Sequence, residues 1–229
     1  TRRSSDLPWL QPRCCEPAQG EAIKKHPLNP PPGGFFYALS PGATFDPGHL
    51  VTSRARRHSV GMPRQINFLV IHCAATPNGR WTDVSAINLW HRQRGFKRTA
   101  AVRHRYQPML DAIGYHWVIY TDGRRVPGRS PEELGAHAAG FNRDSLGICL
   151  VGTDKFTEVQ WVALAALVRE LCAQYGIPLQ LADPKDPRGP RGVIGHGQLP
   201  GVAKSCPGFD VRKWLAMGLN PDQSNIQRP

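Results

Sequence analysis

The amino-acid sequence predicts an α/β domain with a central mixed β-sheet flanked by helices and preceded by a loop-rich N-terminal extension. Two continuous apolar runs, INFLVIHC and SLGICLVG, are typical of buried strands. Segments with helical periodicity alternate with them, which is the pattern of an α/β sheet. A DG pair between two alternating segments predicts one hairpin as well. The 229 residues suffice for one good-sized domain and an extension.

The first part of the chain has a different composition from the rest. Residues 1–64 contain NPPPGG and SPGATFDPGH and show little periodicity. Such dense Pro and Gly punctuation predicts a loop-rich or disordered segment. We therefore expect the main folded domain over residues 65–218 and a C-terminal tail over residues 219–229. We also expect the functional protein to begin near Met62, immediately before the first well-formed strand.

The predicted domain begins with a strand and a helix. The run Ile66–Cys73 predicts a buried strand, and WTDVSAINLWHRQRG predicts a helix after it. Thr82 or Asp83 can cap this helix, and Gly95 can end it. The basic residues 96–112 are predicted as a surface insertion that is partly helical.

The next segment, GYHWVIYTDGRRV, alternates as a half-buried strand does, and Asp122-Gly123 predicts the turn of its hairpin. The alternation predicts one face made of Tyr115, Trp117 and Ile119 and an opposite face made of His116, Val118 and Tyr120.

The clearest helix of the sequence is TEVQWVALAALVRELCAQYG. Thr157 and Gln160 form a capping box, and Gly176 is the predicted stop. Its apolar stripe, predicted to be core, consists of Trp161, Leu164, Val168, Leu171 and Tyr175. A loop over Asp183–Gly192, a short strand VIGH and a final helix DVRKWLAMG complete the fold.

The charge and the cysteines limit the class of protein. The formal net charge is +12, shared between the N-terminal 64 residues and the remainder, which favours an anionic partner: nucleic acid, membrane surface or cell wall. No apolar run approaches 18 residues, and no apolar segment follows the basic N-terminus, so neither a membrane span nor a signal peptide is predicted. The six cysteines do not have the spacing of a disulfide framework, which indicates a reduced, cytosolic state.

Three side chains form a candidate metal site. His72 and His196 each end a predicted strand, and Cys206 lies in the loop after the second. Strand ends at one edge of a sheet are where α/β proteins place their sites. Two imidazoles and a thiolate suit Zn²⁺, and three protein ligands leave a fourth position for water, as in catalytic zinc sites. The alternative is that each histidine is a hydrogen-bonded structural residue.

Five motifs occur in a collinear order that is specific to one family. They are INFLVIHCAAT, WHRQRGF, GYHWVIYTDG, AHAAGFNRDSLGICLVG and GHGQLPGVAKSCPGFD, and the likeness they carry extends over about Ile66 to Leu215. The sequence resembles the zinc-dependent N-acetylmuramoyl-L-alanine amidases of type 2, which include phage lysozyme-amidases and peptidoglycan-recognition proteins. The resemblance implies an amidase catalytic domain over residues 65–218.

The resemblance also implies roles for individual residues. His72, His196 and Cys206 would bind zinc, which lowers the pKa of a bound water and polarises the scissile carbonyl. Lys204 would stabilise the oxyanion, and Tyr115 would donate a hydrogen bond or orient the water. Candidate substrate-binding residues are His137, Asn142, Trp90 and His91. His116 is predicted to be structural.

One position departs from part of the family. Some relatives have Glu in the strand that corresponds to SLGICLVG, where it acts as a general base. Cys149 occupies that position here, as in phage-type enzymes. A neutral buried thiol is a poor base, so Tyr115 and the zinc-activated water would carry more of the proton transfer.

The predicted function is therefore an endolysin-like, zinc-dependent hydrolase that cleaves the N-acetylmuramoyl–L-alanine amide of peptidoglycan. We expect cytoplasmic synthesis without a signal peptide and action on the bacterial cell wall. One alternative is a non-catalytic peptidoglycan-binding module. Another is an amidase that also regulates a viral RNA polymerase. A nucleic-acid partner is not favoured, because no helix-turn-helix, zinc finger or interleaving of aromatic and basic residues is evident.

Overall fold

A five-stranded mixed sheet forms the centre of the fold. The structure, a computed structural model, describes residues 64–186 and 189–228, so the predicted extension over residues 1–64 lies outside the described residues except for Arg64. The strands are β1 (Phe68–Cys73), β2 (Trp117–Ile119), β3 (Arg125–Pro127), β4 (Ser145–Leu150) and β5 (Gly192–Gly195). Their order is β3-β2-β4-β1-β5, and only β3 is antiparallel to its neighbour. The predicted fold class is confirmed.

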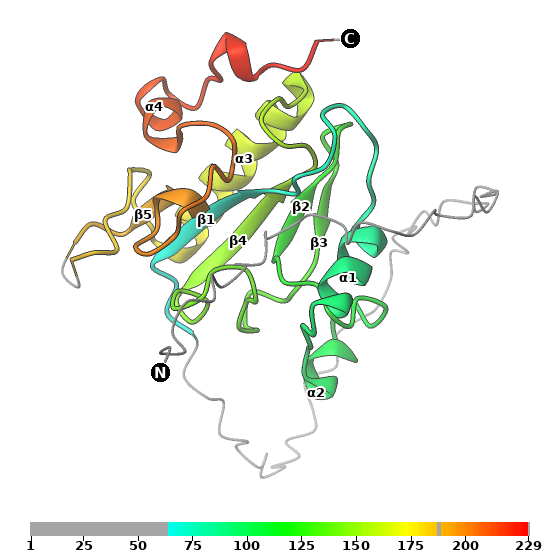
Figure 1. Cartoon of the computed structure of the whole chain (residues 1–229). Helices are drawn as coiled ribbons and strands as arrows, with labels where there is room; N and C mark the ends of the chain where they lie inside the picture. The colour runs from blue at the N-terminus through cyan, green and yellow to red at the C-terminus, as the bar shows by residue number, and fades with distance from the viewer. Residues whose placement is uncertain (1–63, 187–188, 229) are drawn as a thin grey trace, which may run out of the picture. The chain divides into compact units, whose positions relative to one another are not determined.

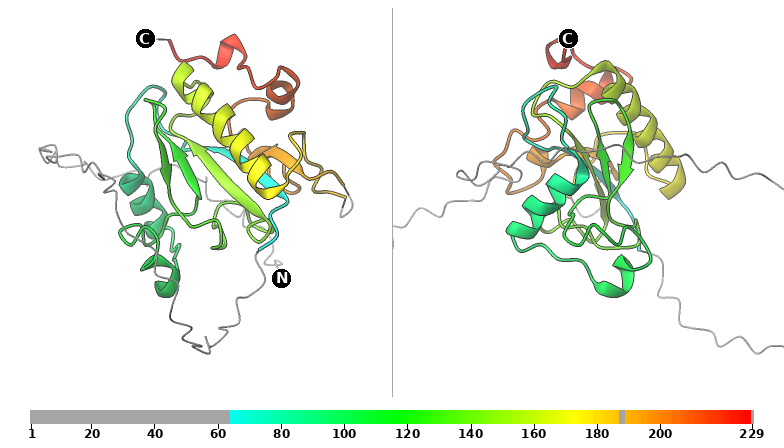
Figure 2. Two further views of the ribbon diagram at one scale, coloured as in Figure 1. Left: turned by 180° about the vertical axis from the view of Figure 1, so that it is seen from behind. Right: turned by 90° about the vertical axis from the view of Figure 1, so that its right-hand side faces the viewer.

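Helices cover both faces of this sheet. Helix α3 (Glu158–Tyr175) packs on one face, and α1 (Val84–Gln93) lies on the opposite face, with the short α2 (Ala100–Arg103) below it (Figure 1, Figure 2). The α3-side cluster contains Leu69, Ile71 and Ile148 from the strands together with the apolar stripe of α3. None of the helices in the described part of the chain is long and apolar enough to cross a membrane.

The helix α3 forms as its sequence predicts. Thr157 accepts from the backbone N–H of Gln160, and the Gln160 side chain accepts from the Thr157 N–H, which is the expected capping box. Gly176 ends the helix in the left-handed region at φ 60°. Four residues of the predicted stripe are buried, namely Trp161, Leu164, Val168 and Leu171. The fifth, Tyr175, is partly buried and packs against the same cluster.

Asp83, rather than Thr82, caps the start of helix α1. The Asp83 carboxylate accepts from the Ala86 N–H at 2.9 Å. The face turned toward the sheet buries Ile87 and His91. Gly95 follows the helix with φ 80°, as predicted.

The hairpin β2–β3 turns at Asp122-Gly123, where Gly123 has φ 82°. The predicted alternation is correct for Trp117 and Ile119, which pack on the α3 side. It is wrong for Tyr115, which packs with Val118 and Tyr120 in a second hydrophobic cluster on the opposite face of the sheet, called the α1-side cluster below. Strand β2 begins only at Trp117, so the pleat that alternates side chains does not extend back to Tyr115.

The predicted surface insertion over residues 96–112 is partly helical, and α2 buries none of its residues. One charged residue of the insertion, Arg98, is nevertheless buried. The guanidinium of Arg98 donates to the carboxylate of Glu133 at 2.8 Å and to the carbonyls of Tyr106, Gln107 and Leu110. The insertion is therefore folded around a buried cation.

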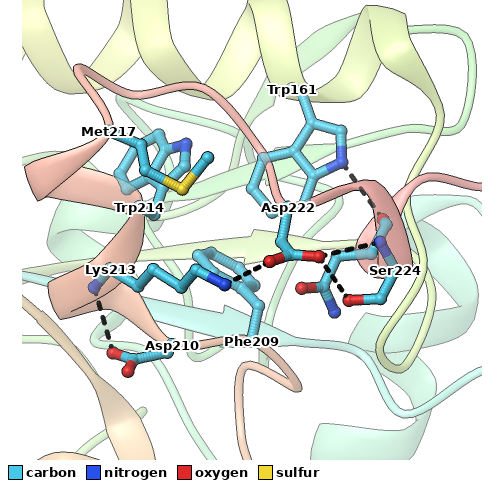
Figure 3. Close-up of a pocket in the computed structure, with 9 residues that line it drawn as sticks. Trp161, Phe209, Asp210, Lys213, Trp214, Met217, Asp222 and Ser224 are labelled. Atoms are coloured by element: carbon cyan, nitrogen blue, oxygen red, sulfur yellow. Dashed lines mark hydrogen bonds and ion pairs between the residues drawn. The ribbon is translucent and has the colours of Figure 1, made fainter.

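The last residues pack onto the domain. After α4 (Val211–Ala216), the 3₁₀-helix η2 (Gln223–Asn225) leads into a backbone ladder in which Phe156 donates to Asn225 and accepts from Gln227. A cavity of about 180 Å³ lies between these elements. In Figure 3, Asp222 pairs with Lys213 there, and the Trp161 indole N–H donates to the Asn225 carbonyl. Residues 219–228 thus form part of the folded unit.

Candidate zinc centre and active site

The parallel pairing of β1 and β5 brings two distant histidines together. Ile71 pairs with Gly195. The next residue after each of them, His72 and His196, therefore lies beside the other at the carboxyl ends of these adjacent strands. Because residues in register on parallel strands point to the same face, both side chains lie on the α1 side of the sheet. Their ring centroids are 4.5 Å apart, and both side chains are buried.

The loop after His196 returns Cys206 to the same point. The Gly197 N–H donates to the Cys206 carbonyl at 2.7 Å. A Cβ on Gly197 would lie 2.0 Å from the Lys204 carbonyl oxygen, so only glycine allows the loop to close this tightly. The Cys206 Sγ lies 3.8 Å from Nδ1 of His72. One donor atom from each of the three residues lies within 4.8 Å of the other two.

The electrostatic environment favours the metal-binding form of both histidines. Burial lowers the pKa of His72 well below its usual range, and the neighbouring His196 and Lys204 act in the same direction. Burial and Lys204 lower the pKa of His196 to about 4. Both imidazoles are therefore neutral at pH 7, which is the protonation state that ligates metals.

An unsatisfied atom supports the same assignment. Nδ1 of His196 is buried and has no hydrogen-bond partner among the described residues. Buried polar nitrogens are normally paired, so an orphaned acceptor beside a second imidazole and a thiol needs an explanation. Two imidazole nitrogens and one thiolate fit a tetrahedral zinc ion with one position open.

A cavity of about 560 Å³ opens at His196, whereas His72 and Cys206 are not among the residues that line it. Tyr115 and Lys204, the two predicted catalytic residues, both line it. The Tyr115 ring lies 5.1 Å from the His72 ring, centroid to centroid. Lys204 is near enough to lower the pKa of both His72 and His196. The arrangement can therefore place a cation and a phenol beside a metal-bound substrate.

Cys149 pairs with His72 in the register of β4 and β1, and it is fully buried in the α1-side cluster. It is not among the residues that line the cavity. Its position gives it no access to a substrate, which agrees with the prediction that this thiol is not a base.

The predicted substrate-binding residues differ in their placement. His137 and Asn142 line the cavity, and the Asn142 Oδ1 accepts from the His137 N–H at 2.9 Å. His91 also lines it, but its Nδ1 accepts from the Gly114 N–H at 2.8 Å. Trp90 packs against the α1-side cluster and is not among the lining residues, so its placement gives no support to a substrate contact. His116 is structural as predicted, because its Nδ1 accepts from the Gly147 N–H at 3.0 Å.

Two features of the site were not predicted from the sequence. Arg94 and Phe96 line the cavity without having been singled out, and His137, predicted as a substrate-binding residue, also contacts His72 directly. One signal was present, because Gly147 interrupts an otherwise apolar strand. A glycine inside a strand often marks a close approach, and a Cβ there would lie 2.5 Å from the His137 ring.

Comparisons with known proteins show the family of this chain. Residues 62–209 match the family described as N-acetylmuramoyl-L-alanine amidase. The endolysin of Escherichia phage T7 is 30% identical over 154 residues, which cover 64% of this chain and 83% of the phage protein. The endolysin of Enterobacteria phage K11 is 31% identical over 157 residues, with coverage of 65% and 84%.

A solved structure has the same fold. It is the N-acetylmuramoyl-L-alanine amidase LysC from Clostridium intestinale URNW, with a TM-score of 0.51 and 25% identity over 69% of this chain and 87% of LysC. The family match covers more than half of the chain and contains all three candidate zinc ligands. The chain therefore belongs to the N-acetylmuramoyl-L-alanine amidase family.

Proposed function

We propose that this chain hydrolyses the amide bond between N-acetylmuramic acid and L-alanine in peptidoglycan, with His72, His196 and Cys206 as the ligands of a catalytic zinc ion. The observation that supports it most is the convergence of these three donors within 4.8 Å of one another, beside a cavity that His196, Tyr115 and Lys204 line. Endolysins among the relatives support action on the bacterial cell wall.

The ligand set suits a catalytic ion. Three protein ligands leave one coordination position for water or substrate. A zinc ion bound there would supply a water of lowered pKa and an electrophile for the amide carbonyl. His72 and His196 accept this role as neutral bases, since burial lowers the pKa of each.

Lys204 and Tyr115 act on the substrate. As the amide carbon becomes tetrahedral, negative charge develops on its oxygen, and the Lys204 ammonium stabilises that charge electrostatically. The Tyr115 hydroxyl donates a hydrogen bond to the reacting oxygen or orients the attacking water. Tyr115 is only 2% exposed, so packing against His91 and the α1-side cluster fixes its ring before substrate binds.

The charge of the cavity suits its proposed ligand. Its lining includes the cations Arg94 and Lys204, and none of the described residues that line it is acidic. The stem peptides of peptidoglycan carry carboxylates, which such a cavity attracts. The predicted RNA polymerase partner stays a prediction, since no observation on the described residues bears on it.

A product analysis tests the proposal. Purified protein incubated with cell-wall sacculi should release new amino-terminal L-alanine without new reducing sugar ends. A chelator should stop the reaction, and added zinc should restore it. New reducing ends would instead indicate a glycosidase, and activity that survives complete removal of zinc would contradict the zinc centre.

Substitution of the two cavity residues separates chemistry from metal binding. Lys204→Ala should lower kcat by roughly 10²–10³-fold, the usual effect of removing one oxyanion donor. Tyr115→Phe should also lower kcat, because the ring packing remains and only the hydroxyl is lost. Both variants should keep stoichiometric zinc, measured by metal analysis. Ser205→Ala, at an exposed position in the same loop, is the matched control and should retain full kcat.

A further inference from the structure

The candidate zinc ligand His72 has a second contact on the side away from Cys206. Nε2 of His72 lies 3.1 Å from Nδ1 of His137, and both side chains are buried. The two rings are nearly perpendicular, at 86°, with centroids 5.1 Å apart. This geometry is that of an N–H···N hydrogen bond, in which one ring donates to the in-plane lone pair of the other.

The two nitrogens of His72 face different partners. Nδ1 faces the Cys206 Sγ at 3.8 Å, whereas Nε2 faces His137. A neutral imidazole holds one proton, and a nitrogen that ligates a metal cannot hold it. If Nδ1 of His72 is the ligand atom, the proton is on Nε2. That N–H then donates to Nδ1 of His137, which must be unprotonated.

The surroundings hold His137 in place to accept this bond. The backbone N–H groups of His137 and Ala138 both donate to Oδ1 of Asn142, at 2.9 and 3.0 Å. The His137 ring packs over Gly147 of β4, where a Cβ would lie 2.5 Å from it. A glycine in the middle of a buried strand therefore makes the space that the ring occupies.

We propose that His137 is a positioning residue of the metal site: its Nδ1 accepts a hydrogen bond from Nε2–H of His72 and so fixes the tautomer and ring orientation with which His72 presents Nδ1 to zinc. This inference rests on the proposed zinc centre. Histidine ligands commonly donate their other N–H to a fixed acceptor, and loss of that acceptor typically weakens metal affinity by about 10–100-fold. His137 lines the cavity as well, so the same ring also forms part of its wall.

Zinc affinity measured by competition with a chromophoric chelator tests the inference without an activity assay. His137→Phe keeps a ring of similar size but has no acceptor, and its Kd for zinc should rise by about 10–100-fold. His137→Gln can accept through its side-chain carbonyl and should recover part of this loss. His104→Phe, at an exposed position, should leave the Kd unchanged. Equal affinities for the wild type and both His137 variants would overturn the inference.

Nitrogen NMR of the zinc-loaded wild-type chain gives a second test that needs no variant to fold. His72 should appear as the Nε2–H tautomer, with a scalar coupling across the hydrogen bond to Nδ1 of His137. An Nδ1–H tautomer of His72 without that coupling would rule out the proposed bond. If the wild type binds no zinc, the zinc centre fails. If it binds zinc and exposes amino-terminal L-alanine on peptidoglycan but His137→Phe binds zinc equally well, only the positioning role fails.

Discussion

Cys206→Ala should abolish amidase activity and stoichiometric zinc binding together. The substitution leaves only His72 and His196 as donors, and two imidazoles are fewer than the three protein ligands of a catalytic zinc site. The appearance of new amino-terminal L-alanine in digested sacculi and the zinc content of the purified variant measure the two losses. The fold should persist, because Cys206 is only partly buried at the margin of the α3-side cluster.

Two further variants make this result specific. Cys206→Asp replaces the thiolate with a carboxylate, which also ligates zinc, so part of the zinc binding should return. Cys172→Ala removes another free thiol, which lies in α3 on the opposite face of the sheet, and it should keep both zinc and activity. A Cys206→Ala variant that retains both would show that the metal, if present, is held elsewhere.

Glu133→Ala should destabilise the domain by about 3–5 kcal/mol, the usual cost of removing one partner from a buried ion pair. The Glu133 carboxylate accepts from Arg98 at 2.8 Å and from Arg129 at 3.3 Å, and the three side chains are 0–6% exposed. Without the carboxylate, two guanidinium groups stay buried with carbonyl partners alone. Chemical denaturation of the wild type and the variant measures the difference.

The expected loss is a large part of the stability of a domain, which is typically about 5–15 kcal/mol. The matched control is Glu170→Ala, which breaks the partly exposed pair of Glu170 with Arg125 and should change stability by about 0–1 kcal/mol. Glu133→Gln should lie between the two, because the amide oxygen still accepts a hydrogen bond. Equal stability of Glu133→Ala and the wild type would show that the buried network contributes nothing.

This network also supports the site. The Arg129 N–H donates to the Tyr115 carbonyl at 2.9 Å, and its guanidinium donates to the Ile113 carbonyl at 2.6 Å. The backbone that carries Tyr115 is therefore attached to the segment that the Arg98–Glu133 pair stabilises. We expect Glu133→Ala to lower amidase activity partly through the position of Tyr115.

Helix ends and the hairpin turn could be predicted because their signals are local. The capping box of Thr157 and Gln160, the stop at Gly176 and the turn at Asp122-Gly123 each depend on residues within a few positions of one another. The prediction for Tyr115 was wrong because it assumed that β2 begins two residues earlier than it does. The boundaries of a strand depend on where it pairs with another strand, and the alternation of residues within one segment does not reveal that pairing.

The sequence by itself determined the alternation of strands and helices, the three candidate zinc ligands and the family. The tertiary structure decided which side chains meet. The register of Ile71 with Gly195 places His72 beside His196, and the closure of the loop at Gly197 returns Cys206 and Lys204 to them. It also decided the contact of His137 with His72 and the burial of Arg98 against Glu133. These pairs are 65 and 35 residues apart along the chain, and only strand pairing and packing bring such distant residues into contact.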